Sequence, residues 1–384
     1  MPNIDKLVND LTLNEKVQLL SGFDAWHTNK IDRLNIPSIK MSDGPNGVRG
    51  DGNSGQPSAC FPSAISLGST WDMGLINKLG IELGSEAKLK DVDVLLGPTI
   101  NIHRHPLGGR HFESYSEDPY LTGRIAIEYV NGVQSKNVAS CLKHFVGNDT
   151  EFQRYAVSSN IDERTLREIY LLPFEMGIKE SNAKSVMSAY NKLNNIYCSS
   201  HKQLLIDILK KEWNFDGYVV SDWGAALENI ENANGGLDLE MPGPAKSWGT
   251  NLVQAIERGD VPVSEINDKV KRILNIAVFS KRFDDPDLKA EKSKDTSAQR
   301  MLLKKAAQDG MVLLKNEGLL PLNRNISSIG VIGPNAKKSQ IIGGGSAHLM
   351  AYHESHPLKA IKDTLGKTSK INYSKGCHTH RYLP

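Results

Sequence analysis

Polar side chains that can perform chemistry follow five successive apolar runs of the sequence. Carboxylates in such positions can act as nucleophiles, acids or bases, and cationic or phenolic groups can bind hydroxyls. In parallel α/β barrels the carboxyl ends of the strands meet at one mouth, where the active site lies. The pattern therefore predicts one polar site at that mouth. Its members are Ser42-Asp43, Lys143-His144, Tyr190-Asn191, Asp222-Trp223 and Asp238-Leu239-Glu240.

Asp222 is the strongest single candidate in this set. It follows the apolar run that ends at Val220 and precedes Trp223. A partly desolvated carboxylate beside an aromatic face suits a nucleophile that attacks a sugar carbon, with the sugar ring stacked on the indole. The alternative is that Asp222 caps the N-terminus of a following helix, a role for which Asp is well suited. The spacing leaves both interpretations open.

Lys143, His144 and Tyr190 supply candidate groups for binding. The lysine and histidine can hydrogen-bond hydroxyls, and the lysine charge can keep a nearby carboxylate ionised. Tyr190 can donate its phenol to a reacting carboxylate. The alternatives are a solvated lysine beside a packed histidine, and a tyrosine that simply lies at the rim of the barrel.

Three arginines, Arg49, Arg110 and Arg154, lie in expected loops near the same strand ends. A single loop arginine is usually just solvated. Three beside one mouth can form a clamp for a polar ligand, because each guanidinium group presents several donors in a fixed plane.

His103-Arg104-His105 offers a different chemistry. Metal-dependent barrel hydrolases use such a histidine pair at a strand end, together with further histidines and an aspartate at later strand ends. Here only His144 and Asp222 can complete the set, and the pair falls several residues beyond its apolar run. We therefore expect no metal site, and a metal-dependent hydrolase that uses His103 and His105 is the weaker alternative.

Short apolar runs alternate with longer stretches of helical periodicity between residues 36 and 280. The predicted strands are 36–41, 92–97, 138–142, 185–189, 217–220 and 236–241, and the predicted helices include 75–89, 119–135, 164–180, 202–212 and 263–279. Such alternation predicts a parallel sheet covered by helices. We expect a (β/α)8 TIM-like barrel over residues 1–280, with a doubly wound sheet as the alternative.

The chain changes character after this region. Residues 281–299 are highly charged and predict an exposed linker. A helical stretch at 301–308 and apolar runs at 311–315 and 329–332 follow it. Residues 300–384 therefore predict the beginning of a second α/β unit.

Composition excludes several classes of function. The 384 residues carry 46 Lys plus Arg and 44 Asp plus Glu, so the net charge of +2 gives no electrostatic basis for binding nucleic acid or an acidic membrane. No apolar run approaches the roughly 18 residues that a membrane span needs.

Residues 1–6 show no signal peptide, and Cys60, Cys141, Cys198 and Cys377 are too scattered for a disulfide framework. We expect a cytoplasmic protein, unless the true start lies upstream; the oligomeric state is not predicted.

Longer strings of the sequence resemble one enzyme family. They are SDGPNGVRG (42–50), GPTINIHRHPLGGRHFESYSEDPYL (97–121), KHFVGND (143–149), DERTLREIYLLPFE (162–175), MSAYNKLN (187–194), VVSDWGA (219–225), GLDLEMPG (236–243), DGMVLLKNEGLLPL (309–322) and IGGGSA (342–347). Together they make the chain resemble the N-terminal portion of a glycoside hydrolase family 3 β-glucosidase. The likeness covers essentially the whole chain.

The resemblance implies a (β/α)8 TIM-like barrel followed by the incomplete start of an α/β sandwich domain. It implies retaining hydrolysis of terminal non-reducing β-D-glucosyl residues, from a β-glucoside or a short β-gluco-oligosaccharide, without a metal or organic cofactor. Asp222 is then the nucleophile that forms a glycosyl-enzyme ester. The matching residues of the glucose-binding subsite are Asp43, Arg49, Arg110, Lys143, His144, Arg154 and Tyr190, with Trp223 as the aromatic beside the nucleophile.

The resemblance also raises the question of the acid/base residue. In β-glucosidases of this family that glutamate comes from the second domain, downstream of the loop that matches residues 343–346. The barrel loop 147–157 lacks the histidine that the family's N-acetylglucosaminidases use, and nothing supports Glu113, Glu117 or Glu240 as a replacement. We therefore expect a fragment of a longer β-glucosidase without this glutamate. A non-catalytic sugar-binding remnant is the alternative.

Overall fold

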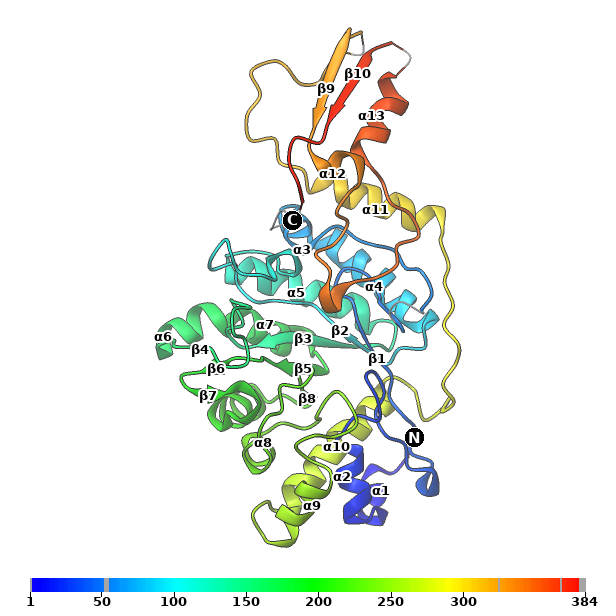
Figure 1. The fold of residues 1–384 in the computed structure, drawn as a ribbon. Helices are drawn as coiled ribbons and strands as arrows, with labels where there is room; N and C mark the ends of the chain where they lie inside the picture. The colour runs from blue at the N-terminus through cyan, green and yellow to red at the C-terminus, as the bar shows by residue number, and fades with distance from the viewer. Residues whose placement is uncertain (1, 52–54, 324, 367, 380–384) are drawn as a thin grey trace.

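A curled sheet of five parallel strands forms the centre of the molecule (Figure 1). The computed structural model describes residues 2–51, 55–323, 325–366 and 368–379, so Met1 and residues 380–384 of the expected second unit lie outside the described residues. Every residue of the five strands is buried, as expected for a parallel sheet covered on both faces. In spatial order the strands are β1 (Met41–Asp43), β2 (Val94–Leu96), β3 (Ala139–Phe145), β5 (Ser185–Ser188) and β8 (Tyr218–Ser221).

Helices follow these strands in the alternation that the sequence predicts. The longer ones are α4 (Met73–Leu89), α5 (Pro119–Gln134), α7 (Leu172–Ser181), η6 (Gln203–Glu212) and α10 (Val263–Phe279). Buried apolar side chains recur along α4, α5 and α10 at helical spacing, so one face of each of these helices packs into the interior.

The helix predicted over 164–180 is divided into three pieces. A short α6 (Glu163–Thr165) leads into a π-helical turn, η4 (Leu166–Tyr170), before α7 begins. Pro173 lies in the first turn of α7. Because proline has no N–H group, it cannot continue the hydrogen-bond ladder from the preceding turn, and the backbone changes its helical form there.

Shorter elements complete the first 280 residues. They are α1 (Ile4–Asp10), α2 (Leu13–Leu19), η1 (Asp32–Leu34), α3 (Ala64–Gly68), η3 (His111–Glu113), β4 (Ser158–Ser159), β6 (Lys192–Leu193), β7 (Ile196–Tyr197), η5 (Cys198–Ser200), α8 (Ile230–Gly235) and α9 (Thr250–Glu257).

Single β-bridges, rather than strands, continue the sheet beyond β8. The strand predicted over 236–241 is therefore wrong, and Pro242 and Pro244, which lack N–H donors, follow it directly. The first predicted strand also starts late, at Met41. The described residues thus show a half-barrel, and the eight-stranded barrel stays a prediction. The bridges join Val220 to Leu239 and Glu240 to Ser21 in parallel, and Gly22 to Thr28 and His27 to Lys40 in antiparallel orientation.

The predicted linker runs along the outside of the molecule as an extended segment between α10 and α11 (Figure 1). Most of its residues are exposed, as predicted, but two charged side chains are buried against the sheet domain. Arg282 lies 3.0 Å from Asp91 and 2.9 Å from Asp93, and Glu291 lies 3.0 Å from Lys40. Since buried charges are costly unless they are paired, these contacts fix the segment in place.

The last part of the chain contains a parallel two-stranded sheet with helices beside it. Its elements are α11 (Ser297–Asp309), β9 (Ser328–Ile332), α12 (Pro334–Lys337), η7 (Gly345–Ala347), α13 (Pro357–Leu365) and β10 (Lys370–Ser374). This agrees with the start of an α/β unit, whereas a sandwich domain stays a prediction, as do the domain boundaries. Within the described residues, no helix is long and apolar enough to cross a membrane.

Candidate active site

One cavity of about 320 Å³ lies at the carboxyl ends of the central strands. It brings together the nine residues that the family resemblance assigns to the nucleophile and the glucose subsite, whereas Ser42, Asn191, Asp238 and Glu240, also predicted at this mouth, do not line it. The nine are Asp43, Arg49, Arg110, Lys143, His144, Arg154, Tyr190, Asp222 and Trp223. The lining also includes Trp26, Met187, Gly345 and Ser346, which the sequence had not assigned.

The sequence gives different amounts of information about the four additional residues. Met187 is an apolar residue within β5, and nothing in its type marks it as part of a polar site. Trp26 lies in the segment before β1, and no apolar run of the sequence ends near it. Gly345 and Ser346 belong to the glycine-rich string at 342–347, which could have been placed at the site from the family resemblance.

Asp222 directly follows β8, and its two carboxylate oxygens have different surroundings. Oδ1 accepts a hydrogen bond of 2.7 Å from the backbone N–H of Trp223. Oδ2 is buried and has no hydrogen-bond partner among the described residues. The next helix, α8, begins only at Ile230, so the helix-capping interpretation is wrong. Burial raises the pKa of Asp222, and the charges of Arg110 and Lys143, the N–H of Trp223 and the hydroxyl of Tyr190 oppose this rise.

Lys143 and Asp43 form an ion pair at the floor of the cavity. The lysine Nζ donates to Asp43 Oδ1 at 2.8 Å, and the side chains are only 1% and 7% exposed. The N–H of Gly44 donates to the same oxygen at 2.7 Å. Burial alone would raise the pKa of Asp43, but the lysine and this N–H hold it below its ordinary value. Asp43 is therefore an ionised hydrogen-bond acceptor.

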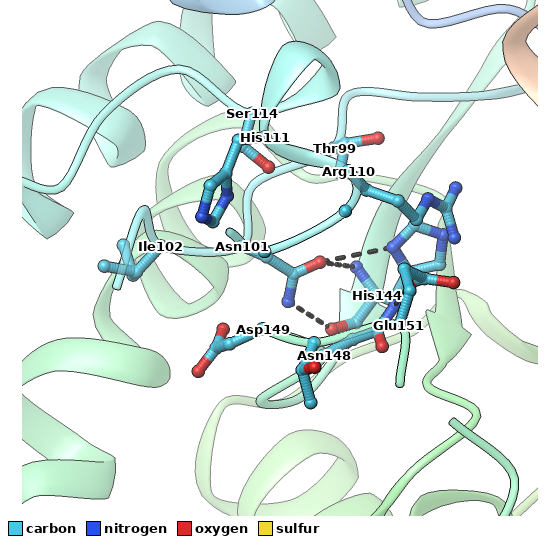
Figure 2. Close-up of a pocket in the computed structure, with 13 residues that line it drawn as sticks. Thr99, Asn101, Ile102, Arg110, His111, Ser114, His144, Asn148, Asp149 and Glu151 are labelled. Atoms are coloured by element: carbon cyan, nitrogen blue, oxygen red, sulfur yellow. Dashed lines mark hydrogen bonds between the residues drawn. The ribbon is translucent and has the colours of Figure 1, made fainter. Parts of the chain in front are cut away.

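His144 is buried beside Lys143 and is held by Asn101 (Figure 2). Its Nε2 lies 3.5 Å from Asp222 Oδ2. Burial, together with the charges of Arg110, Lys143 and Arg154, lowers the pKa of His144 well below its ordinary value. The imidazole is therefore neutral, and its contact with Asp222 is not an ion pair.

The loop arginines at 110 and 154 are each held by a glutamate three residues away. Arg110 donates from Nε and Nη2 to the two carboxylate oxygens of Glu113, both at 3.0 Å. Arg154 donates to Glu151 at 2.9 Å, and its guanidinium group lies 4.0 Å from the ring centroid of Tyr190. Both contacts orient guanidinium groups toward the cavity.

Arg49 links the sheet domain to the last part of the chain. Its Nη1 donates to the carbonyl oxygen of Ser346 at 2.9 Å. Its guanidinium group also lies over the ring of Trp26, 5.5 Å from the centroid. The glycine-rich segment thus closes one side of the cavity. Both the sheet domain and the last part of the chain therefore contribute residues to the site.

Two tryptophans form an aromatic wall of the cavity. The rings of Trp26 and Trp223 lie 5.5 Å apart and are tilted by 39°. The indole N–H of Trp223 donates to the carbonyl of Ala25 at 2.8 Å, and the hydroxyl of Tyr190 donates to the carbonyl of Trp223 at 3.1 Å. These bonds fix the indole and the backbone next to Asp222. A sugar ring can stack on such a wall.

The histidine pair considered for a metal lies outside the cavity lining. His103 Nε2 faces the carbonyl oxygens of Ser114 at 2.8 Å and His111 at 3.1 Å. A ring nitrogen that faces carbonyl oxygens carries a proton, so it has no lone pair for a metal. His105 is exposed. This arrangement gives the metal-dependent alternative no support.

The three glutamates weighed as acids have other surroundings. Glu113 is buried and paired with Arg110. Glu240 accepts hydrogen bonds from the backbone N–H groups of three consecutive residues, 246–248, and therefore fixes a turn. Glu117 is exposed and does not line the cavity.

Comparisons with known proteins identify the family of the chain. The model of the glycosyl hydrolase family 3 N-terminal domain matches residues 4–276, and that of the family's C-terminal domain matches residues 311–377. A β-glucosidase from Rhizobium radiobacter is 48% identical over 99% of this chain and 47% of its own length. The chain thus spans about half the length of the curated relatives it matches.

Solved structures show the same likeness. The β-glucosidase from Kluyveromyces marxianus in complex with glucose superposes with a TM-score of 0.93 and 40% identity, over 100% of this chain and 47% of that chain. β-Glucosidase 3B from Thermotoga neapolitana in complex with α-D-glucose gives a TM-score of 0.88 and 35% identity, over 97% and 55% of the two chains.

Proposed function

This chain belongs to glycoside hydrolase family 3, and we propose that it carries the glucose-binding and nucleophile part of a retaining β-glucosidase site. The observation that carries the proposal is the state of Asp222. One of its oxygens is fixed by a backbone N–H, the other is buried without a hydrogen-bond partner among the described residues, and the residue lines a cavity with hydroxyl-binding groups. A free carboxylate oxygen in such a place suits attack on an anomeric carbon.

Sugar binding in this proposal is shared between charged and neutral groups. Asp43 accepts from hydroxyls, and Lys143 and the three arginines donate to them. Because the low-dielectric cavity strengthens such bonds, groups that contact the sugar more closely in the transition state accelerate the reaction. Trp223 and Trp26 supply the apolar face of the subsite.

The reaction forms an ester between Asp222 and the anomeric carbon while the bond to the aglycone oxygen breaks. Water then attacks the same carbon, the ester bond to Asp222 breaks, and glucose leaves with retained configuration, while the acid residue of the first step takes the proton from the water. The aglycone oxygen needs a proton unless it leaves as a stable anion. The pKa of Asp43 is held low by its lysine, so Asp43 is a poor donor. We assign proton donation to a glutamate of the family's second domain.

We propose the complete fold together with this function. The half-barrel and its bridges are the core of an irregular (β/α)8 barrel, and residues 300–384 begin an α/β sandwich domain. The substrate is a β-glucoside or a short β-gluco-oligosaccharide.

A covalent trap tests the proposal without the proton donor. The chain is incubated with 2,4-dinitrophenyl 2-deoxy-2-fluoro-β-glucoside, whose leaving group departs as a stable anion. We expect stoichiometric release of dinitrophenolate and a mass increase of one fluoroglucosyl group on the peptide that contains Asp222. Asp222→Asn should lower the trapping rate by about a thousandfold or more. Asp216→Asn, an exposed position, is the control.

Other outcomes separate the alternatives. Glucose binding without trapping would support the non-catalytic sugar-binding remnant. Absence of both would overturn every reading of the cavity as a glucose site. Activity that a chelator abolishes would restore the metal-dependent alternative.

A further inference from the structure

Asn101 holds His144 through three contacts that leave only one orientation for its amide (Figure 2). The amide nitrogen Nδ2 donates to the carbonyl oxygen of His144 at 2.9 Å. The backbone N–H of His144 donates to Oδ1 at 2.8 Å. Because a carbonyl can only accept and a backbone N–H can only donate, the oxygen and nitrogen of this amide cannot be exchanged. Asn101 is itself buried, 7% exposed.

This orientation also decides the tautomer of His144. The ring Nδ1 lies 3.2 Å from the same Oδ1, which is an acceptor. Nδ1 therefore carries the ring proton. The charged groups around the imidazole are Arg110, Lys143, Arg154 and Asp222; burial and the three cations keep the ring neutral. A neutral imidazole protonated at Nδ1 presents a lone pair at Nε2.

Two hydrogen-bond acceptors consequently face each other in the cavity. Nε2 of His144 lies 3.5 Å from Oδ2 of Asp222, and that oxygen has no hydrogen-bond partner among the described residues. While Asp222 is ionised, neither atom can satisfy the other; the Tyr190 hydroxyl interacts with the Asp222 carboxylate but leaves Nε2 without a donor, and a buried acceptor without a donor is costly. The pair can be satisfied by O–H donors that arrive with the ligand.

We infer that Asn101 is a positioning residue that fixes His144 as an acceptor, so that the site selects sugars with a donating hydroxyl on a ring carbon next to the reacting one. The inference rests on the proposed function, because that function identifies the ligand as a sugar. It changes the expected role of His144, since a histidine in a cationic pocket would otherwise be assigned as a donor to hydroxyls. Asn101 acts only through His144.

The tautomer is measured directly by ¹⁵N NMR of histidine-labelled protein. The signal of His144 is identified among the 11 histidines by its loss in His144→Gln. We expect Nε2 to show the shift of an unprotonated ring nitrogen and Nδ1 that of an N–H. A protonated Nε2 in the unliganded protein would overturn the inference, whatever the result of the trapping experiment.

Two substitutions test the role of Asn101. Asn101→Asp places a carboxylate against Nδ1 and favours a doubly protonated imidazole, so the Nε2 signal should move to that of an N–H. Asn101→Ala removes the clamp and should give a mixture of tautomers. Asn232→Asp, which buries a carboxylate elsewhere, is the matched control and should leave the His144 signals unchanged. Unchanged His144 signals in folded Asn101→Asp would also overturn the inference.

Deoxyfluoro sugars measure the consequence for binding, because fluorine accepts but cannot donate hydrogen bonds. Glucose with fluorine in place of the C2 hydroxyl should bind the original chain about tenfold more weakly than glucose itself, whereas fluorine at C3 should have a smaller effect. That difference should shrink in Asn101→Asp, where Nε2 donates. Equal loss in both proteins would refute the acceptor role, while failure of glucose itself to bind would refute the proposed function but leave the tautomer assignment standing.

Discussion

The cavity is built by two groups of residues that reach it in different ways. Lys143 and Asp43 lie on strands of the central sheet, and their side chains are 1% and 7% exposed. Arg110 and Arg154 lie on loops, and their side chains are 15% and 33% exposed. The strand residues are fixed by the register of the sheet, whereas the loop arginines depend on separate glutamates that do not line the cavity. Burial therefore decides how much each contact contributes.

Lys143→Met should have the largest effect, because it leaves the buried carboxylate of Asp43 without its charge partner. We expect a loss of about 3–5 kcal/mol in the free energy of unfolding, measured by urea denaturation, and no detectable glucose binding. The loss in the free energy of unfolding should become smaller as the pH falls. An unpaired, buried Asp43 takes up a proton more readily, and its protonation removes the penalty.

Two further variants define this effect. Adding Asp43→Asn to Lys143→Met should restore most of the stability, although not the binding, since no unpaired charge remains. Lys211→Met removes an exposed lysine from an exposed pair and should change stability by less than about 1 kcal/mol. If the single Lys143 variant were as stable as the Lys211 control, the strand residues would not depend on their pairing.

Glu113→Gln should have the next largest effect, through Arg110. Gln keeps one acceptor but loses the charge and the two-point contact with the guanidinium group. We expect glucose affinity to fall by about 10- to 100-fold, as measured by titration calorimetry, with a smaller loss of stability than in Lys143→Met. Glu117→Gln, an exposed position nearby, is the control. An unchanged affinity would mean that the loop alone positions Arg110.

The same division explains what the sequence could predict. Asp43, His144 and Asp222 were placed at one mouth because parallel strands end at one edge, and the structure confirms this. The partners of the arginines could not be predicted, because Glu113 lies in the single turn η3 and Glu151 in a loop, and neither conformation has a periodic signal in the sequence. Asn101 was missed for a similar reason. Its role depends on a contact with a residue 43 positions away, which no local pattern reveals.

The predicted elements divide in a comparable way. The helix over 263–279 has the predicted bounds, because a long amphipathic stretch specifies itself. The segment 236–241 has a similar apolar character but forms only bridges, since pairing depends on the neighbouring chain and ends at the prolines. Arg282 and Glu291 in the linker show that partners distant in the sequence matter there too. Their charge predicts exposed side chains, but ion pairs with the sheet domain allow both side chains to be buried.

Arg110→Gln tests whether a loop residue affects a strand-end residue, because the charge of Arg110 lowers the pKa of Asp222. Burial raises the pKa of Asp222 and Arg110 opposes the rise. The rate of trapping by the fluoroglucoside should increase with pH as Asp222 ionises, with a midpoint above the ordinary value of about 4 for an aspartate. Arg110→Gln should move this midpoint further upward. A midpoint that stays in place would show that burial alone sets the ionisation of Asp222.

Glu151→Gln should have the smallest effect, although its geometry resembles that of Glu113. The Glu151–Arg154 pair is 24% and 33% exposed, so solvent screens it, and the guanidinium group keeps its contact with the Tyr190 ring at 4.0 Å. We expect a loss of glucose affinity below about fivefold, with Glu163→Gln as the exposed control. A loss as large as that of Glu113→Gln would show that every loop arginine depends on its glutamate regardless of burial. The relevant division of the site would then be between strands and loops, and not between buried and exposed ion pairs.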